Sequence, residues 1–275
     1  MSQFSWENEW RLQNLKEESF LVRHVMDKSP KWIKLVEKRV PATLQNTLEA
    51  AFGKAFVTVF DKGAIIIEKT YRKDEQIKRY KSNQRHMNQE GFHGRMVRSF
   101  DREAKGTVCK NLAIASVEGV GFGLIGWGIP DIPIFVSVML KSIYEIALSY
   151  GFSYTSDREK LFILKVIDAA LKSGELLREK DEELNRLINR YYEEEMLPKE
   201  EWKEDVFVTE LKITRQIDFS SKALSHELLY GKFIQGTTIV GVIGGVADFT
   251  CLKRITDYAV LKYKRRFLLR QMTEL

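Results

Sequence analysis

Residues 119–133 read GVGFGLIGWGIPDIP, and residues 134–151 continue as IFVSVMLKSIYEIALSYG. The second part is a nearly continuous apolar run that ends at Gly151, a residue type that often terminates a helix. Helix-spaced apolar residues recur along the flanking chain, and no pair of segments shows the alternation of polar and apolar residues that marks strands. Even residues 64–67, which strand propensity would favour, have no partner strand. We therefore predict an all-α fold.

The expected helices cover most of the chain and form a single multi-helix bundle. They span residues 4–27, 31–39, 41–59, 94–118, 134–151, 158–173, 176–195, 200–230 and 248–273. Asp157 is the expected N-cap of one of these helices, and Gly174 is its expected end. We assign residues 1–275 to one helical domain, with residues 1–40 as an N-terminal helical extension. The polar stretch 71–93 is interpreted as a connection that is either mobile or an exposed helix.

The composition indicates a folded intracellular protein. Of the 275 residues, 44% are apolar and 30% are charged, which argues against disorder. Cys109 and Cys251 are the only cysteines, as expected in a reducing compartment, and the charged N-terminus lacks the apolar core of a signal peptide. The net charge of +6 is compatible with an anionic membrane surface or nucleic acid and requires neither. We therefore expect a cytoplasmic protein.

A second glycine-rich segment, IQGTTIVGVIGGVAD at residues 234–248, follows the same plan as residues 119–133. Each segment carries no charge until it reaches an aspartate, Asp131 or Asp248. An aspartate at such a place can cap the helix that follows and oppose its positive end. We interpret the two segments as an internal pseudo-repeat that forms two Gly-rich apolar helical hairpins.

Glycines four residues apart occur in both segments, and on a helix they make a smooth face that another backbone can approach. One interpretation is tight packing of the two hairpins inside the bundle. The other is contact with a membrane, without a simple spanning helix, because a bilayer needs about 20 consecutive apolar residues. The candidate membrane or partner contacts are Gly119, Gly121, Gly123, Trp127, Gly241, Gly244, Gly245, Lys262, Lys264, Arg265 and Arg266.

The last four of these residues belong to the basic helix 248–273, where Tyr258, Tyr263 and Phe267 lie between the cations. Basic residues mixed with aromatics suit an anionic lipid surface. The same mixture can bind nucleic acid, which we favour least, or can be the charged face of an ordinary core helix.

Sequence motifs for catalysis are weak. Residues 121–126 spell GxGxxG, but no strand precedes them and Pro130 and Pro133 follow, so a dinucleotide site is not expected. The four histidines lack metal-site spacing, and neither a nucleophile elbow nor a Walker loop occurs. We predict no metal and no cofactor, and we lean toward a protein that is not an enzyme.

Two alternatives remain open. Asp131, Glu145 and Asp248 could converge in a polar cleft, which would make the protein a small-molecule binder or an enzyme. The glycine-rich segments could instead perturb membranes, as in a toxin or defence protein.

Two regions of the chain together resemble a known protein family. The first contains Gly121-Phe-Gly-Leu-Ile-Gly and Pro130-Asp-Ile-Pro, and the second contains Gly241-Val-Ile-Gly-Gly and Lys262-Tyr-Lys-Arg-Arg-Phe-Leu268. The family that they resemble is the bacterial EcsC protein family. The resemblance extends from about residue 40 onward. The family is named for a gene next to an ABC exporter, so the resemblance implies a helical bacterial protein with a role in transport or secretion. It brings no catalytic residues. We therefore expect a cytoplasmic protein, peripheral to the inner face of the cell membrane, whose partner is an anionic membrane surface or an envelope complex.

Overall fold

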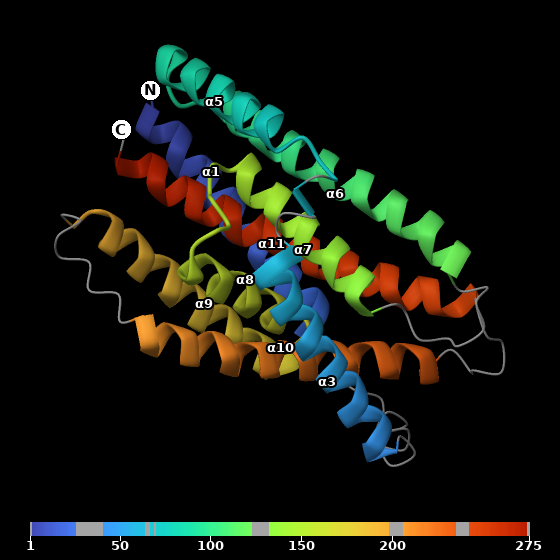
Figure 1. Cartoon of the computed structure of the whole chain (residues 1–275). Helices are drawn as coiled ribbons and strands as arrows, with labels where there is room; N and C mark the ends of the chain where they lie inside the picture. Colours follow the sequence, from blue (N-terminus) through green and yellow to red (C-terminus); the bar gives the residue numbers. More distant parts are fainter. Residues whose placement is uncertain are drawn as a thin grey trace.

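The computed structural model describes residues 2–25, 41–63, 67–68, 70–122, 132–197, 206–234 and 242–273. Within these ranges the chain forms helices joined by turns, and no strand is present. The all-α prediction is therefore confirmed, and Figure 1 shows the helices gathered into one bundle. The expected helix 31–39 lies outside the described residues.

The helices begin and end close to the predicted positions, except that the last two begin at Val206 and Val242, where the predicted starts were residues 200 and 248. Their bounds are α1 (Ser2–Val25), α3 (Ala42–Thr58), the π-helical turn η1 (Val59–Gly63), α5 (Lys73–Glu90), α6 (Gly94–Phe122), α7 (Ile132–Ser149), α8 (Asp157–Ala170), α9 (Gly174–Glu195), α10 (Val206–Ile234) and α11 (Val242–Thr273). The polar stretch 71–93 is mainly the helix α5, which packs on α6 and α7 and buries Met87. Of the two readings of this stretch, the exposed helix is the one observed.

Helices α7 and α11 form the centre of the bundle. From Ser142 to Tyr150, every residue is buried, as expected for a helix that is apolar on all sides. Helix α11 packs against α1, α6, α7, α8, α9 and α10, so it touches most of the bundle. Its burial is unusual because this helix carries many cations.

The expected extension 1–40 begins as an integral part of the bundle. Helix α1 lies along α11 and α9, and Phe20 and Leu21 are buried. The indole Nε1 of Trp6 donates to the carbonyl oxygen of Leu268 at 2.7 Å, and Nε2 of Gln13 donates to that of Leu261 at 2.8 Å. These long-range bonds hold the first helix against the last one.

Three predicted helix boundaries are wrong. The N-cap of α8 is Ser156, whose Oγ accepts from the backbone N–H of Glu159 at 3.2 Å, and Asp157 is the first helical residue. Its carboxylate instead pairs with Lys160 one turn later. Helix α8 ends at Ala170, so Gly174, with φ of 63°, opens α9 rather than ending α8. Helix α11 begins at Val242, so Asp248 is not at the start of this helix.

The helices that border the two glycine-rich segments meet at one end of the bundle. In Figure 1, α6 and α10 end there, and α7 and α11 begin there. Helix α11 packs against each of the other three. Residues 123–131 and 235–241, and with them the expected hairpins, lie outside the described residues.

Candidate functional site

Three of the basic residues that were expected at an outer surface of α11 are internal. Lys262 is 0% exposed, Lys264 2% and Arg266 8%, while Arg265 is half-buried. The expectation that these residues form an outer contact surface is therefore wrong for Lys262, Lys264 and Arg266. Each of them enters a separate group of ion pairs inside the bundle.

Lys262 joins α11 to α1 and α9. Its Nζ lies 2.8 Å from Oε2 of Glu17 and 2.7 Å from Oδ1 of Asp181, and it donates to Oδ1 of Asn185 at 2.9 Å. The hydroxyl of Tyr258 donates to the same Asp181 oxygen at 2.7 Å. Burial, together with the Asp181 charge, raises the pKa of Tyr258 well above its usual value, so this hydroxyl remains a donor.

Lys264 joins α11 to α6 and to the start of α1. Its Nζ lies 2.8 Å from Oδ2 of Asp101 and 3.3 Å from Oε2 of Glu9. The other Asp101 oxygen accepts from the hydroxyl of Tyr150 at 2.8 Å. Both Asp101 oxygens are thus satisfied, and the buried ammonium has two carboxylates beside it.

Arg266 joins α11 to α8. Its two Nη atoms donate to the two carboxylate oxygens of Glu159 at 2.7 and 2.9 Å, a planar two-bond geometry that only arginine offers. Tyr263 donates to Glu159 at 2.6 Å. The guanidinium also lies 4.1 Å from the ring centre of Phe152 and 4.3 Å from that of Phe162. This pair is enclosed by aromatic rings.

Arg265 lies nearer the surface. It donates to Oε2 of Glu17 at 3.1 Å and to Oδ1 of Asn14 at 3.0 Å, and its guanidinium lies 4.6 Å from the ring centre of Trp10. These partners all belong to α1. The basic run of α11 therefore holds the bundle together and is occupied by internal partners.

Glu145 is the one residue of the expected polar cleft whose side chain is described. It is 4% exposed and accepts from Nδ2 of Asn111 and from Nε2 of Gln76, the latter at 3.2 Å. Burial raises its pKa, against the two hydrogen bonds and the charges of Lys141 and Lys110. The side chains of Asp131 and Asp248, and with them the expected cleft, lie outside the described residues.

Four of the seven expected contacts in the glycine-rich segments lie in described helices, whose ends meet at one end of the bundle. Gly119 and Gly121 lie in the last turns of α6, and Gly244 and Gly245 in the first turn of α11. Gly123, Trp127 and Gly241 lie outside the described residues.

In the part of the chain that the structure describes, no three His, Cys, Asp or Glu side chains are grouped so that they could hold a metal ion. One described helix, α7, is long and apolar enough to cross a membrane, but 67% of its residues are buried inside the bundle. That degree of burial is typical of the core helix of a helical bundle.

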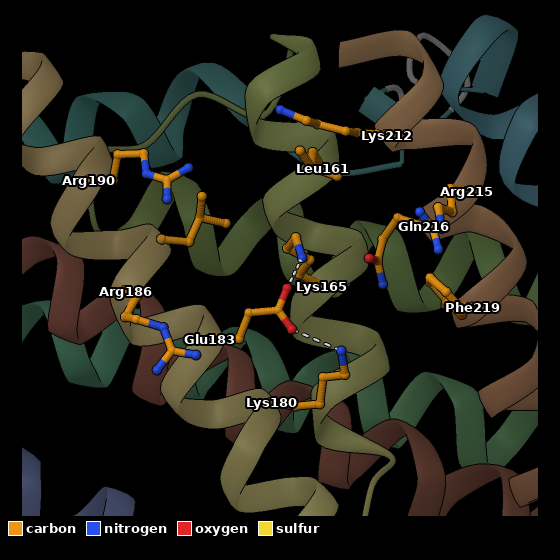
Figure 2. A pocket seen from close by; sticks show the side chains of 11 residues that line it. Leu161, Lys165, Lys180, Glu183, Arg186, Arg190, Lys212, Arg215, Gln216 and Phe219 are labelled. Atoms are coloured by element: carbon orange, nitrogen blue, oxygen red, sulfur yellow. Dashed lines mark hydrogen bonds and ion pairs between the residues drawn. The ribbon is translucent and has the colours of Figure 1, made fainter. Parts of the chain in front are cut away.

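Sequence reasoning missed a basic hollow of about 420 Å³ on the outside of the bundle. Figure 2 shows it between α9 and α10, with α8 behind. Its lining residues are Leu161, Lys165, Lys180, Glu183, Arg186, Leu187, Arg190, Lys212, Arg215, Gln216 and Phe219. Six of these are cations and one is a carboxylate. Because they come from three helices, no local pattern in the sequence indicates them.

Comparison with known proteins gives one consistent result. A model described as the EcsC protein family matches residues 6–268. Protein EcsC of Bacillus subtilis (strain 168) is 25% identical over 169 residues, which cover 61% of this chain and 61% of that protein. No solved structure matches the chain.

Proposed function

The chain belongs to the EcsC protein family, and from its family and fold we propose that it is a non-enzymatic protein acting at the inner face of the cell membrane. At the inner face of the membrane, the alternative binding partner is an envelope complex, such as one that contains an ABC exporter. The proposal names no reaction. The only described member of the expected carboxylate cleft, Glu145, has its oxygens occupied by Asn111 and Gln76.

One observation carries the proposal: the helices that flank the two uncharged glycine-rich segments, α6 with α7 and α10 with α11, end and begin at the same end of the bundle (Figure 1). Residues 119–130 and 235–247 contain no charged side chain. Uncharged segments of this kind at one place supply apolar area suited to a membrane interface or a protein partner. They are shorter than a spanning helix requires, so the proposed contact is peripheral.

The electrostatic part of the proposed contact differs from the sequence-based expectation. Lys262, Lys264 and Arg266 are neutralised within the bundle, so attraction to anionic lipid requires cations elsewhere on the surface. The chain retains a net charge of +6, which is compatible with such attraction.

Sedimentation with vesicles tests this function. The full chain is mixed with phosphatidylcholine vesicles, with and without phosphatidylglycerol. We expect binding to the anionic vesicles, and a loss of about tenfold or more in Trp127→Glu and Gly244→Glu, because a charge is costly in an apolar interface. The control is Ser82→Glu, at an exposed position of α5.

A wild-type protein that stays in the supernatant with both vesicles would overturn the proposal. Equal binding by wild type and both segment variants would overturn the assignment of the contact to the glycine-rich end. Unfolding curves of each variant show whether a lost contact reflects lost structure.

A further inference from the structure

The hollow between α9 and α10 is an unusual concentration of positive charge. Lys165 comes from α8, Lys180, Arg186 and Arg190 from α9, and Lys212 and Arg215 from α10. Helix α8 packs against both α9 and α10. Figure 2 shows the cations of the three helices around a common space, with Glu183 near the middle.

The single carboxylate, Glu183, is shared by two of the cations. It accepts from Lys165 at 2.5 Å and from Lys180 at 2.9 Å. Burial acts to raise its pKa, but the two lysine hydrogen bonds and charges outweigh it and lower the pKa to about 2. Glu183 is therefore ionised at neutral pH and is saturated by these two lysines.

The other four cations are little compensated by the residues that the structure describes. Within that part of the chain, Arg190 and Lys212 have no carboxylate within ion-pair distance. Arg215 lies 5.7 Å from the ring centre of Phe219, and Arg186 reaches Glu182 at 3.8 Å on a solvated surface. Cations that face one another without counter-charge repel, and a bound anion would relieve that repulsion.

Gln216 adds an independent observation. It is 7% exposed, and its Nε2 is buried without a hydrogen-bond partner in the described structure. Figure 2 shows its amide directed from α10 into the hollow, toward the side where Lys165 lies. A buried donor without an acceptor costs free energy, so this atom indicates a missing acceptor in the hollow.

The hollow also has an apolar part. Leu161 and Leu187 line it, and Phe219 is 43% exposed at its edge. A ligand that satisfies both parts would carry an anionic group with several acceptor oxygens and an apolar portion beside it. Arginine and amide donors around an apolar floor suit a phosphate ester better than a simple carboxylate, because phosphate offers more acceptor oxygens to several donors at once.

We propose that this hollow binds the phosphate group of an acidic phospholipid, an inference that rests on the proposed membrane role. Arg190, Lys212 and Arg215 neutralise the phosphate, and Gln216 Nε2 donates to one of its oxygens. Phe219 and Leu187 contact the first carbons of the lipid. The hollow would thereby supply the electrostatic attraction that the buried cations of α11 cannot.

The test compares matched charge changes in the full chain. The hollow variant carries Arg190→Glu and Lys212→Glu, and the control carries Lys78→Glu and Lys222→Glu, two exposed lysines on α5 and α10 outside the hollow. A third variant is Gln216→Leu. Each is measured for binding to vesicles of phosphatidylcholine with phosphatidylglycerol, and by calorimetry for binding to inorganic pyrophosphate.

We expect the hollow variant to bind the anionic vesicles at least about tenfold more weakly than the control. Gln216→Leu, which changes no charge, should weaken binding about five- to tenfold because one hydrogen bond to an anion is lost. Equal losses in the hollow variant and the control would overturn the inference and leave the proposed membrane role standing.

A wild-type chain that ignores the vesicles would instead overturn the proposed function and the lipid as ligand. The pyrophosphate measurement then separates two cases. Binding that disappears in the hollow variant would keep a phosphate site with a soluble ligand, and no binding by wild type would overturn the site itself.

Discussion

Two sets of cations in this bundle differ in burial and in whether carboxylates neutralise them. The run Lys262–Arg266 in α11 is contiguous in sequence and is largely buried, and each member has a carboxylate partner. The cations of the hollow are dispersed over three helices, and Arg190 and Lys212 lack such a partner among the described residues. A dense basic run in the sequence is therefore structural here, and the open positive surface comes from residues far apart in the chain.

The difference follows from helix geometry. Successive residues on an α-helix point about 100° apart, so the adjacent cations Lys264, Arg265 and Arg266 cannot share one face. They point at different neighbours, and each neighbour supplies an acid: Asp101 in α6 for Lys264, Glu17 in α1 for Arg265 and Glu159 in α8 for Arg266. Exposed surfaces arise instead where side chains of separate helices meet at a crossing.

The largest effect is expected from Lys262→Met. This change leaves Glu17 and Asp181 buried with less compensation, and breaking a buried ion pair on one side costs about 3–5 kcal/mol. Urea unfolding at neutral pH measures the loss in free energy of unfolding. Lys253→Met is the control on the same helix, because its pair with Asp257 is exposed and should contribute less than about 1 kcal/mol. Similar losses in both variants would mean that the buried pairs of Lys262 contribute no more than an exposed pair of the same helix.

A second prediction concerns the geometry of a buried pair rather than its charge. Arg266→Lys keeps the positive charge but replaces two parallel bonds to Glu159 with one point contact and loses the stacking on Phe152 and Phe162. We expect a loss of about 2 kcal/mol in unfolding free energy, since bonds between charged groups are worth about that much. A neutral result would mean that charge alone holds α11 to α8.

How far the sequence could predict this molecule depends on the range of the interaction. Helical periodicity is local, so the helices were predictable, including α7 and its end near Gly151. Helix caps depend on single side chains. The predicted N-cap of α8, Asp157, was wrong because Ser156 caps this helix. The partners of Lys262 lie in α1 and α9, and the hollow needs the crossing of α8 with α9 and α10, which no local pattern encodes.

The third prediction is a pH effect within the hollow. The pKa of Glu183 in the folded chain is about 2, below its ordinary value of 4.5, so its pairs with Lys165 and Lys180 stabilise the fold above pH 4.5. That contribution is lost as the pH falls from 4.5 toward 2. Because Glu183 is 39% exposed, we expect only about 1 kcal/mol after allowing for solvent screening. Glu183→Gln should remove this part of the acid sensitivity, and an unchanged pH profile would contradict it.

The smallest effect, and the sharpest contrast with α11, is expected from Arg190→Met. Arg190 has no carboxylate partner among the described residues, so removing this cation from the positive hollow relieves repulsion and should raise the free energy of unfolding slightly, by less than about 0.5 kcal/mol. The matched control is Arg178→Met on the same helix, which breaks an exposed pair with Glu18 and should lower stability by a similarly small amount. With phosphatidylglycerol vesicles present, wild type should become more stable than Arg190→Met, because wild type gains stability from the bound anion and Arg190→Met gains less. A loss of several kcal/mol in Arg190→Met without any anion would place Arg190 with the structural cations of α11.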